Sequence, residues 1–196
     1  MVDTTKPVIA AHADIDVFSP ANSSAVVTYT PPTASDTVDT HVPVNCTPPS
    51  GTFPAGTTTI NCTATDDSGN TATSTFKVNV RYAFTGFFKP IDNLPIVNVV
   101  KAGQAIPVKF SLGGNQGLNI FAAGYPKAAV MTCSTGALDA IEETVTAGGS
   151  SLSYDALTGQ YIYVWKTEKY WGGTGRQLQV TFADGTTKIA HFNFTR

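Results

Sequence analysis

Short runs of alternating apolar and polar residues, broken by turn residues, constrain the fold of this chain more than any other feature. In the run TFKVNV, for example, Phe76, Val78 and Val80 fall on one face of an extended strand. From Val8 to Val80 such runs recur roughly every 8 to 12 residues, a spacing typical of β-sandwiches. Charged residues make up only 13% of the chain, which disfavours long solvated helices. The pattern predicts an all-β chain of two tandem β-sandwich modules.

Two of the three cysteines lie 16 positions apart in matching Asn-Cys-Thr sequences, as Cys46 and Cys62. Each occupies an inward position of its own predicted strand, beside Val44 and Ile60 respectively. We therefore predict a disulfide, which would place the chain outside the cytoplasm. Closing a loop of this length stabilises a fold by roughly 3 kcal/mol.

The charge balance excludes several classes of partner. The net charge is −2 with only 12 lysines and arginines, so we expect no nucleic-acid binding. No apolar run is long enough for a membrane span, and the opening MVDTTKPVIA lacks the features of a signal peptide. We expect the sequence to be part of a longer secreted chain.

Three consecutive motifs carry a resemblance to a known family. They are FPAGTTTI at residues 53–60, TATDDSGN at residues 63–70 and FKVNV at residues 76–80. Together they resemble the HYR (hyalin repeat) domain, an immunoglobulin-like module of extracellular proteins. The resemblance covers about residues 3–81 and implies an extracellular or cell-surface location.

The remainder of the chain, residues 82–196, is similar to the PxKF module of secreted bacterial proteins. The element that gives the module its name is PVKF at residues 107–110. The resemblance implies a bacterial extracellular context and no catalytic role. We predict domains at residues 1–81 and 82–196, joined by a segment with few contacts near residues 81–86. We expect at most a short helix, around residues 137–143.

The third cysteine, Cys133, departs from the PxKF pattern. In that pattern a cysteine usually occupies the position of Gly175, where it would be the natural partner of Cys133. Glycine stands there instead, so the resemblance implies that Cys133 is a free thiol. Burial as a small apolar side chain is the commoner fate of such a cysteine.

Oxygen ligands gather in the segment DDSGN, which offers Asp66, Asp67 and Asn70. Carboxylate and amide oxygens are the ligands that calcium prefers, so this loop is a candidate calcium site. The spacing is not that of an EF-hand loop. The same residues also favour a plain turn, because Asp and Asn bond their own backbone. We expect no other cofactor.

Aromatic residues offer the best candidate for carbohydrate contact. Tyr161, Tyr163 and Trp165 share one face of a predicted strand that is apolar on both faces, and we expect their rings in the core. Tyr170 and Trp171 follow in a glycine-rich segment, where the chain offers their rings little to pack against. Core packing is favoured over exposure for large aromatic residues in general. A surface ligand contact, if one exists, is to be looked for at Tyr170 and Trp171, with Trp171 the better candidate for exposure.

No catalytic signature is present: the three histidines stand in no recognisable nucleophile motif. We therefore expect no enzyme activity. The predicted function is a structural or adhesion module, a stalk, spacer or filament segment of a secreted or surface-attached bacterial protein. Its partner would be a protein or glycan at a cell surface or matrix, with self-association as a further outcome. The alternative is a carbohydrate-binding accessory module of a secreted hydrolase.

Overall fold

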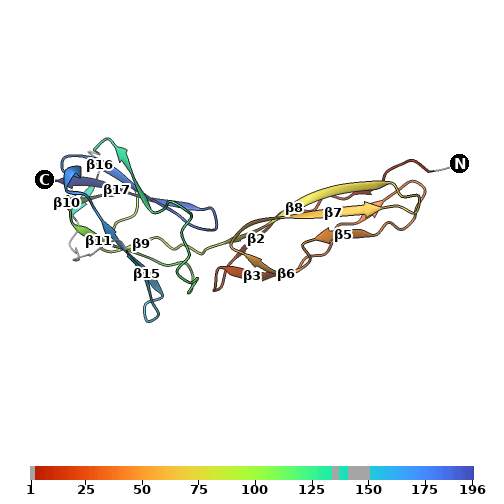
Figure 1. The fold of residues 1–196 in the computed structure, drawn as a ribbon, viewed down its shortest axis with the longest axis horizontal. Coiled ribbons are helices and arrows are strands. Elements are labelled where there is room, and N and C mark those ends of the chain that lie inside the picture. Colours follow the sequence, from red (N-terminus) through yellow and green to blue (C-terminus); the bar gives the residue numbers. More distant parts are fainter. Residues whose placement is uncertain (1–2, 134–136, 141–150) are drawn as a thin grey trace. The chain divides into compact units, whose positions relative to one another are not determined.

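The computed structural model describes residues 3–133, 137–140 and 151–196, which form β-strands joined by turns and loops (Figure 1). Over these residues the only helix is the 3-10 turn η1 (Lys169–Trp171). None of the described helical structure is long and apolar enough to span a membrane. The prediction of an all-β chain is confirmed.

The chain divides into two compact units. The first unit runs to Phe18 and continues over Ser24–Arg81. The second unit consists of Ser19–Ser23 and Tyr82–Arg196.

Eight strands make up the first unit: β1 (Val8–Ile9), β2 (Ile15–Phe18), β3 (Ser24–Val27), β4 (Ala34–Ser35), β5 (Val44–Thr47), β6 (Gly51–Pro54), β7 (Gly56–Thr65) and β8 (Thr71–Arg81). Strands β2, β8, β7 and β5 form a four-stranded sheet in that order. Strand β3 pairs with β6, and β1 pairs with β4. All of these pairs are antiparallel except β2 with β8.

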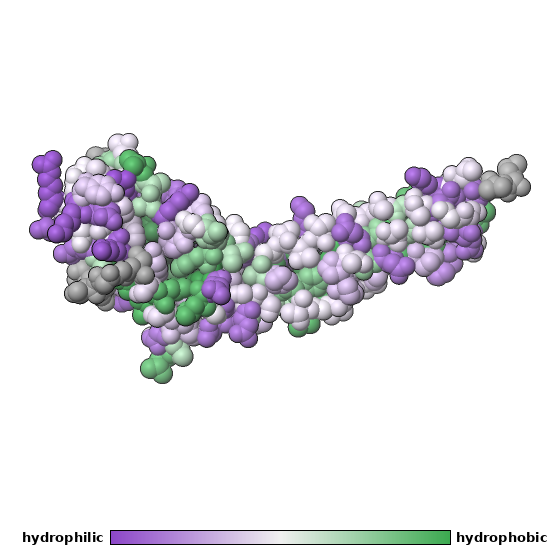
Figure 2. All heavy atoms as spheres, viewed as in Figure 1, coloured by the Kyte–Doolittle hydropathy of each residue, from purple (hydrophilic) through white to green (hydrophobic). Residues whose placement is uncertain are grey.

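The core of the first unit follows the alternation in the sequence. Ile60 and Cys62 on β7 and Val78 on β8 are fully buried, and they pack with Val27 and Phe53 from the β3–β6 pair. Two sheets therefore enclose the core, as in a β-sandwich. Outward positions hold mostly threonine and other polar residues, and Figure 2 shows mainly polar colours on the visible face of this unit.

Nine strands make up the second unit: β9 (Phe87–Phe88), β10 (Val97–Lys101), β11 (Ala105–Phe110), β12 (Lys127–Met131), β13 (Leu138–Ala140), β14 (Ser151–Asp155), β15 (Gln160–Lys166), β16 (Gly175–Thr181) and β17 (Thr187–Thr195). One sheet has the order β12-β16-β17-β10-β13 and the other β14-β15-β11-β9. Strand β10 runs parallel to both of its neighbours, and the remaining pairs are antiparallel.

Aromatic rings fill the core of the second unit. Phe110 on β11 lies 5.5 Å from the ring of Tyr161 and 5.4 Å from that of Phe182. Trp165 on β15 lies 5.0 Å from the ring of Phe192 on the opposing sheet. The expectation that Tyr161 and Trp165 belong to the core is confirmed, and Tyr163 is half-buried. Their strand lies between β14 and β11, so both of its edges are paired within the sheet.

The segment after Arg81 makes more contacts than we expected. The backbone N–H of Tyr82 donates to Asp184 over 2.7 Å, and the Tyr82 ring is buried against Phe182. Phe84 packs on Phe87 at 5.3 Å. The expectation of few contacts is therefore wrong, because two aromatic side chains of this segment enter the second core.

The short segment Ser19–Ser23 belongs to the second unit through one buried glutamine. The side chain of Gln116 accepts hydrogen bonds from the Ser19 hydroxyl at 2.7 Å and from the Ser23 backbone at 2.8 Å. It also donates to the Ser19 carbonyl at 3.0 Å. A buried amide with all of these partners satisfies the rule that buried polar groups are hydrogen-bonded.

The short helix that the sequence allowed around residues 137–143 does not form over the part of this range that the structure describes. Leu138–Ala140 instead forms strand β13, which pairs in parallel with β10 through Val97 and Val99. Residues 141–143 lie outside the described residues. Pairing with the edge of the sheet outweighs the local helix propensity of this segment, because intrinsic propensities are small compared with tertiary contacts.

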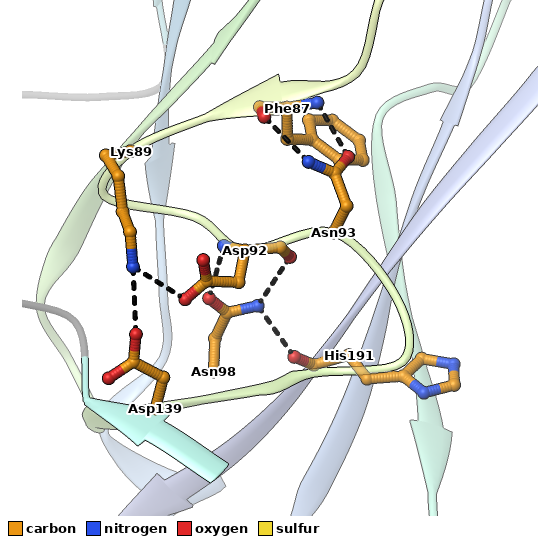
Figure 3. A network of polar contacts seen from close by, with 7 residues as sticks. All are labelled: Phe87, Lys89, Asp92, Asn93, Asn98, Asp139 and His191. Carbon is orange, nitrogen blue, oxygen red and sulfur yellow. Dashed lines mark hydrogen bonds and ion pairs between the residues drawn. The ribbon is translucent and has the colours of Figure 1, made fainter. Parts of the chain in front are cut away.

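A network of polar contacts holds the loop between β9 and β10 (Figure 3). The side chain of Asn98, which is buried, accepts from the Asp92 backbone at 2.8 Å and donates to the carbonyls of Asp92 and His191. Lys89 bridges the carboxylates of Asp92 and Asp139 at 2.9 and 2.8 Å. These hydrogen bonds, first the one with Asp139, raise the pKa of Lys89. The network links the loop to β17 through the His191 carbonyl and to β13 through Asp139.

Candidate functional site

The turn between β7 and β8 is built on Asp66. Its Oδ1 accepts the backbone N–H groups of Ser68 at 3.0 Å and Asn70 at 2.7 Å, and its Oδ2 accepts the Asn70 side chain at 2.9 Å. Gly69 has φ of 87°, which favours glycine. Burial by itself raises the pKa of Asp66, but the hydrogen bonds from Asn70, Ser68 and Gly69 outweigh it and lower the pKa below its ordinary value. The carboxylate therefore works as the organiser of the turn.

The structure groups Asp66 with other carboxylates than those we predicted. One oxygen each from Asp3, Asp39 and Asp66 lie within 4.8 Å of one another. Asp67 is exposed and contributes its backbone N–H, which donates to Asp39 at 3.0 Å. Asn70 donates to Asp66 instead of presenting its oxygen alongside it.

Each of the three grouped carboxylates already has a use in the fold. Asp3 accepts the Thr5 N–H at 2.9 Å, Asp39 accepts that of Asp67, and Asp66 holds its turn. The second oxygen of Asp3 is buried with no hydrogen-bond partner among the described residues. Calcium takes six to eight oxygen ligands. The three carboxylates would supply only three if each contributed one oxygen. Calcium binding at this end of the first unit stays a prediction, to be checked by calcium titration.

The predicted disulfide between Cys46 and Cys62 is present. The two residues stand directly opposite each other on the antiparallel strands β5 and β7. Cys62 is fully buried and Cys46 is half-buried, so the bridge forms part of the first core. A disulfide in this position is typical of a protein that folds outside the cytoplasm.

The two aromatic residues on η1 differ in exposure. Trp171 is only 8% exposed, so its ring takes the favoured core position and is not open to a ligand. It packs 5.8 Å from Trp165 and 5.4 Å from Phe194, with the guanidinium of Arg176 4.9 Å above its ring. The glycine-rich segment folds back, because Gly173 donates to the Phe194 carbonyl at 2.7 Å. This return contact supplies the packing that the local sequence lacks.

Tyr170 is 76% exposed and is the member of the pair that a ligand can reach. It borders an open pocket of about 560 Å³ with Lys101, Ala102, Lys169, Gly172 and Arg196. The three basic residues were not predicted from the sequence as part of a site. They come from distant parts of the chain, and no local motif marks them as a group.

Cys133 is free and exposed. The prediction of a free thiol is confirmed, and that of burial is wrong. The residue lies two positions beyond the end of β12, where Met131 makes the last pair with Gly175. Its sulfur lies 3.9 Å from the Gly173 carbonyl. A Cβ added at Gly175 would lie 2.8 Å from the Met131 carbonyl oxygen and 3.0 Å from the Cys133 nitrogen, so a cysteine there requires the strand end to shift.

Comparison with solved structures finds distant likenesses. One is SGBP-B of the mixed-linkage glucan utilization locus of Bacteroides ovatus, in complex with a mixed-linkage heptasaccharide (TM-score 0.27, 13% identity). Another is the endo-fucoidan hydrolase MfFcnA9 from glycoside hydrolase family 107 (TM-score 0.23, 14% identity). Each alignment covers 97% of this chain, but only 48% and 34%, respectively, of the other protein. Likeness at these TM-scores supports no inference about fold or ligand.

No curated protein matches the chain. A match to a protein family is found for its first part, and it agrees with the disulfide and the sandwich core described above. The resemblance of residues 82–196 to the PxKF module stays a prediction. Residues 2–80 match the family model of the HYR domain.

Proposed function

We propose that the chain is a non-enzymatic structural or adhesion segment, a stalk or spacer, of a secreted or surface-attached bacterial protein. The observation that carries the proposal is the HYR match over residues 2–80. HYR domains are extracellular, and the Cys46–Cys62 disulfide within the matched region suits the same location. The resemblance of the second unit to the PxKF module supports the bacterial context.

The first unit is built to carry load. Strands β7 and β8 pair over ten successive positions from Gly56 opposite Val80 to Thr65 opposite Thr71. The disulfide shortens the chain that unfolding can release, because the residues between Cys46 and Cys62 remain in a closed loop. A segment of this kind holds its ends apart and limits its own extension.

Single-molecule pulling on the full chain tests this function. We expect a force peak when the first unit unfolds. Reduction should lengthen the released chain by roughly 55 Å, the extended length of the 16-residue separation between the cysteines. A first unit that extends without a force peak, oxidised or reduced, would contradict the load-bearing role.

The alternative, a carbohydrate-binding accessory module of a secreted hydrolase, depends on the exposed ring of Tyr170. Burial of Trp171 removes the other aromatic candidate. A glycan-array signal that Tyr170→Ala abolishes would favour this alternative. A signal that persists in that variant would count against it.

A further inference from the structure

We infer that the open pocket bordered by Lys101, Lys169, Tyr170 and Arg196 binds an anionic polysaccharide. Carboxylate or sulfate groups of the polymer would contact the three cations, and a sugar ring would stack on Tyr170. The inference adds a ligand to the proposed extracellular role. It stands on the geometry of the second unit alone.

Three segments distant in the sequence bring the cations together. Lys101 ends β10, and Arg196 follows β17. These strands pair in parallel with Lys101 opposite Thr195, and the N–H of Ala102 donates to the Thr195 carbonyl at 3.0 Å. Lys169 begins η1. The pocket therefore stands on regular hydrogen-bonded backbone.

Two glycines leave room for the stems of these cations. A Cβ at Gly103 would lie 2.6 Å from Cγ of Lys169, and one at Gly172 would lie 3.2 Å from Cγ of Arg196. The backbone at Gly103, with φ of +83°, itself favours glycine. At Gly172 φ is −54°, a conformation that any residue can adopt. Glycine matters there because a side chain would occupy the space next to Arg196. Both cations thus lie against bare backbone at the pocket wall.

The cations of the pocket are available to a ligand. Lys101, Lys169 and Arg196 are exposed, and none of them makes an ion pair with a carboxylate in the part of the chain that the structure describes. Lys89 in the same unit, by contrast, is held by two carboxylates. The nearest acidic residue in sequence is the exposed Glu168, directly before η1. Three unpaired cations around one opening attract anionic groups.

Tyr170 supplies the contact that favours a sugar polymer among anions. Its ring stands edge-on to Trp171, with centroids 6.3 Å apart, and Trp171 is fixed in the core by Trp165 and Phe194. The exposed ring is thus carried on a firmly packed turn. An aromatic face provides a large apolar contact at low entropic cost, which suits the apolar face of a sugar. The pocket volume of about 560 Å³ lies in the usual range of ligand sites.

Binding of the full chain to matched polymers tests the inference. Comparing dextran sulfate with neutral dextran measures the contribution of the sulfate groups to binding. Comparing polygalacturonate with its methyl ester measures the contribution of the carboxylate groups. We expect binding to at least one charged polymer at physiological salt and to neither neutral one. Whichever charged polymer binds identifies the source of the anionic group. No binding to either charged polymer would overturn the inference.

Single substitutions then locate the site. Lys101→Gln, Lys169→Gln and Tyr170→Ala should each weaken binding roughly two- to five-fold, the usual effect of one exposed contact. The matched control is Lys77→Gln, which removes an exposed lysine of the first unit. Equal weakening by the control would show non-specific charge attraction and overturn the site. Tighter binding of a single-stranded DNA oligonucleotide than of either polysaccharide would overturn the ligand class.

Folding and function are kept apart in this test. All the substituted side chains are exposed, and tryptophan fluorescence checks that the second core is intact in each variant. The pulling experiment reads the first unit and does not depend on the pocket. Loss of binding with intact mechanics would therefore leave the structural role standing and remove only the ligand.

Discussion

The two units stabilise similar sandwich cores by different means. The first core is mainly aliphatic and contains the Cys46–Cys62 disulfide. The second core holds stacked and edge-on rings, including those of Phe110, Trp165 and Phe192, and its cysteine is exposed and free. The first unit thus relies on a covalent link, and the second on large buried side chains.

Size explains the difference. A small domain buries a smaller fraction of its surface, so its core alone leaves it marginal. A disulfide offsets this by restricting the unfolded chain. Aromatic side chains bury about 150–250 Å² each, and several of them stabilise a larger sandwich without a crosslink. The two units should therefore fail under different perturbations.

The largest effect is expected from Phe110→Ala in the second unit. Phe110 is fully buried between Tyr161 and Phe182, so the substitution leaves a cavity. Removal of such a ring costs about 3–5 kcal/mol of the free energy of unfolding. Denaturant unfolding followed by tryptophan fluorescence measures the loss, since both tryptophans belong to this unit.

Leu157→Ala is the matched control for this substitution, because Leu157 is 99% exposed. It should change the free energy of unfolding by less than about 0.5 kcal/mol. A comparable loss in both variants would mean that the aromatic core is not what stabilises the second unit.

Removal of the disulfide should have the next largest effect, and in the first unit. The double variant Cys46→Ala, Cys62→Ala should lose roughly 3 kcal/mol, as expected for a loop of this length. Amide signals of Ile60 and Val78, both buried in the first core, would follow the change by NMR. If these signals are lost at the same denaturant concentration in the double variant as in the natural chain, the disulfide does not stabilise the first unit.

A smaller effect is expected from acid at Asp66. Its pKa is lowered in the folded state, so its contribution is fully present above the unfolded pKa of about 3.9 and is lost as pH falls through the folded pKa. The unfolding midpoint of the first unit, measured from pH 5 down to 2, should fall more steeply in the natural chain than in Asp66→Asn. Parallel curves would show that the negative charge of Asp66 does not stabilise the first unit.

The smallest effect is expected from Cys133→Ser. The thiol is exposed and its only described contact is a long one to Gly173, so stability should change by less than about 0.5 kcal/mol. Alkylation of the native protein followed by intact mass should show prompt labelling at one site. Labelling only after unfolding would show that the Cys133 thiol is buried in the folded protein, and would contradict its exposure.

Alternation along the strands was enough to predict the first core. Ile60, Cys62 and Val78 took the inward positions that period two assigns them, and the cysteine spacing identified the bridge. The resemblance to HYR domains extended over nearly the same residues as the family match.

The second unit was harder to predict, because its decisive contacts join distant segments. Trp171 is buried by Phe194, and Leu138 pairs with Val97 on the neighbouring strand. No local pattern reports either contact. The basic pocket had no signal for the same reason, since Lys101 and Arg196 meet only through the pairing of β10 and β17.

Selective reduction tests the contrast between the units most directly. Denaturant unfolding of one sample, with and without reductant, can be followed by tryptophan fluorescence for the second unit and by the Ile60 and Val78 amide signals for the first. We expect that reductant lowers the midpoint of the amide signals and leaves the fluorescence midpoint unchanged. Equal shifts of both midpoints, or a shift of the fluorescence alone, would contradict it.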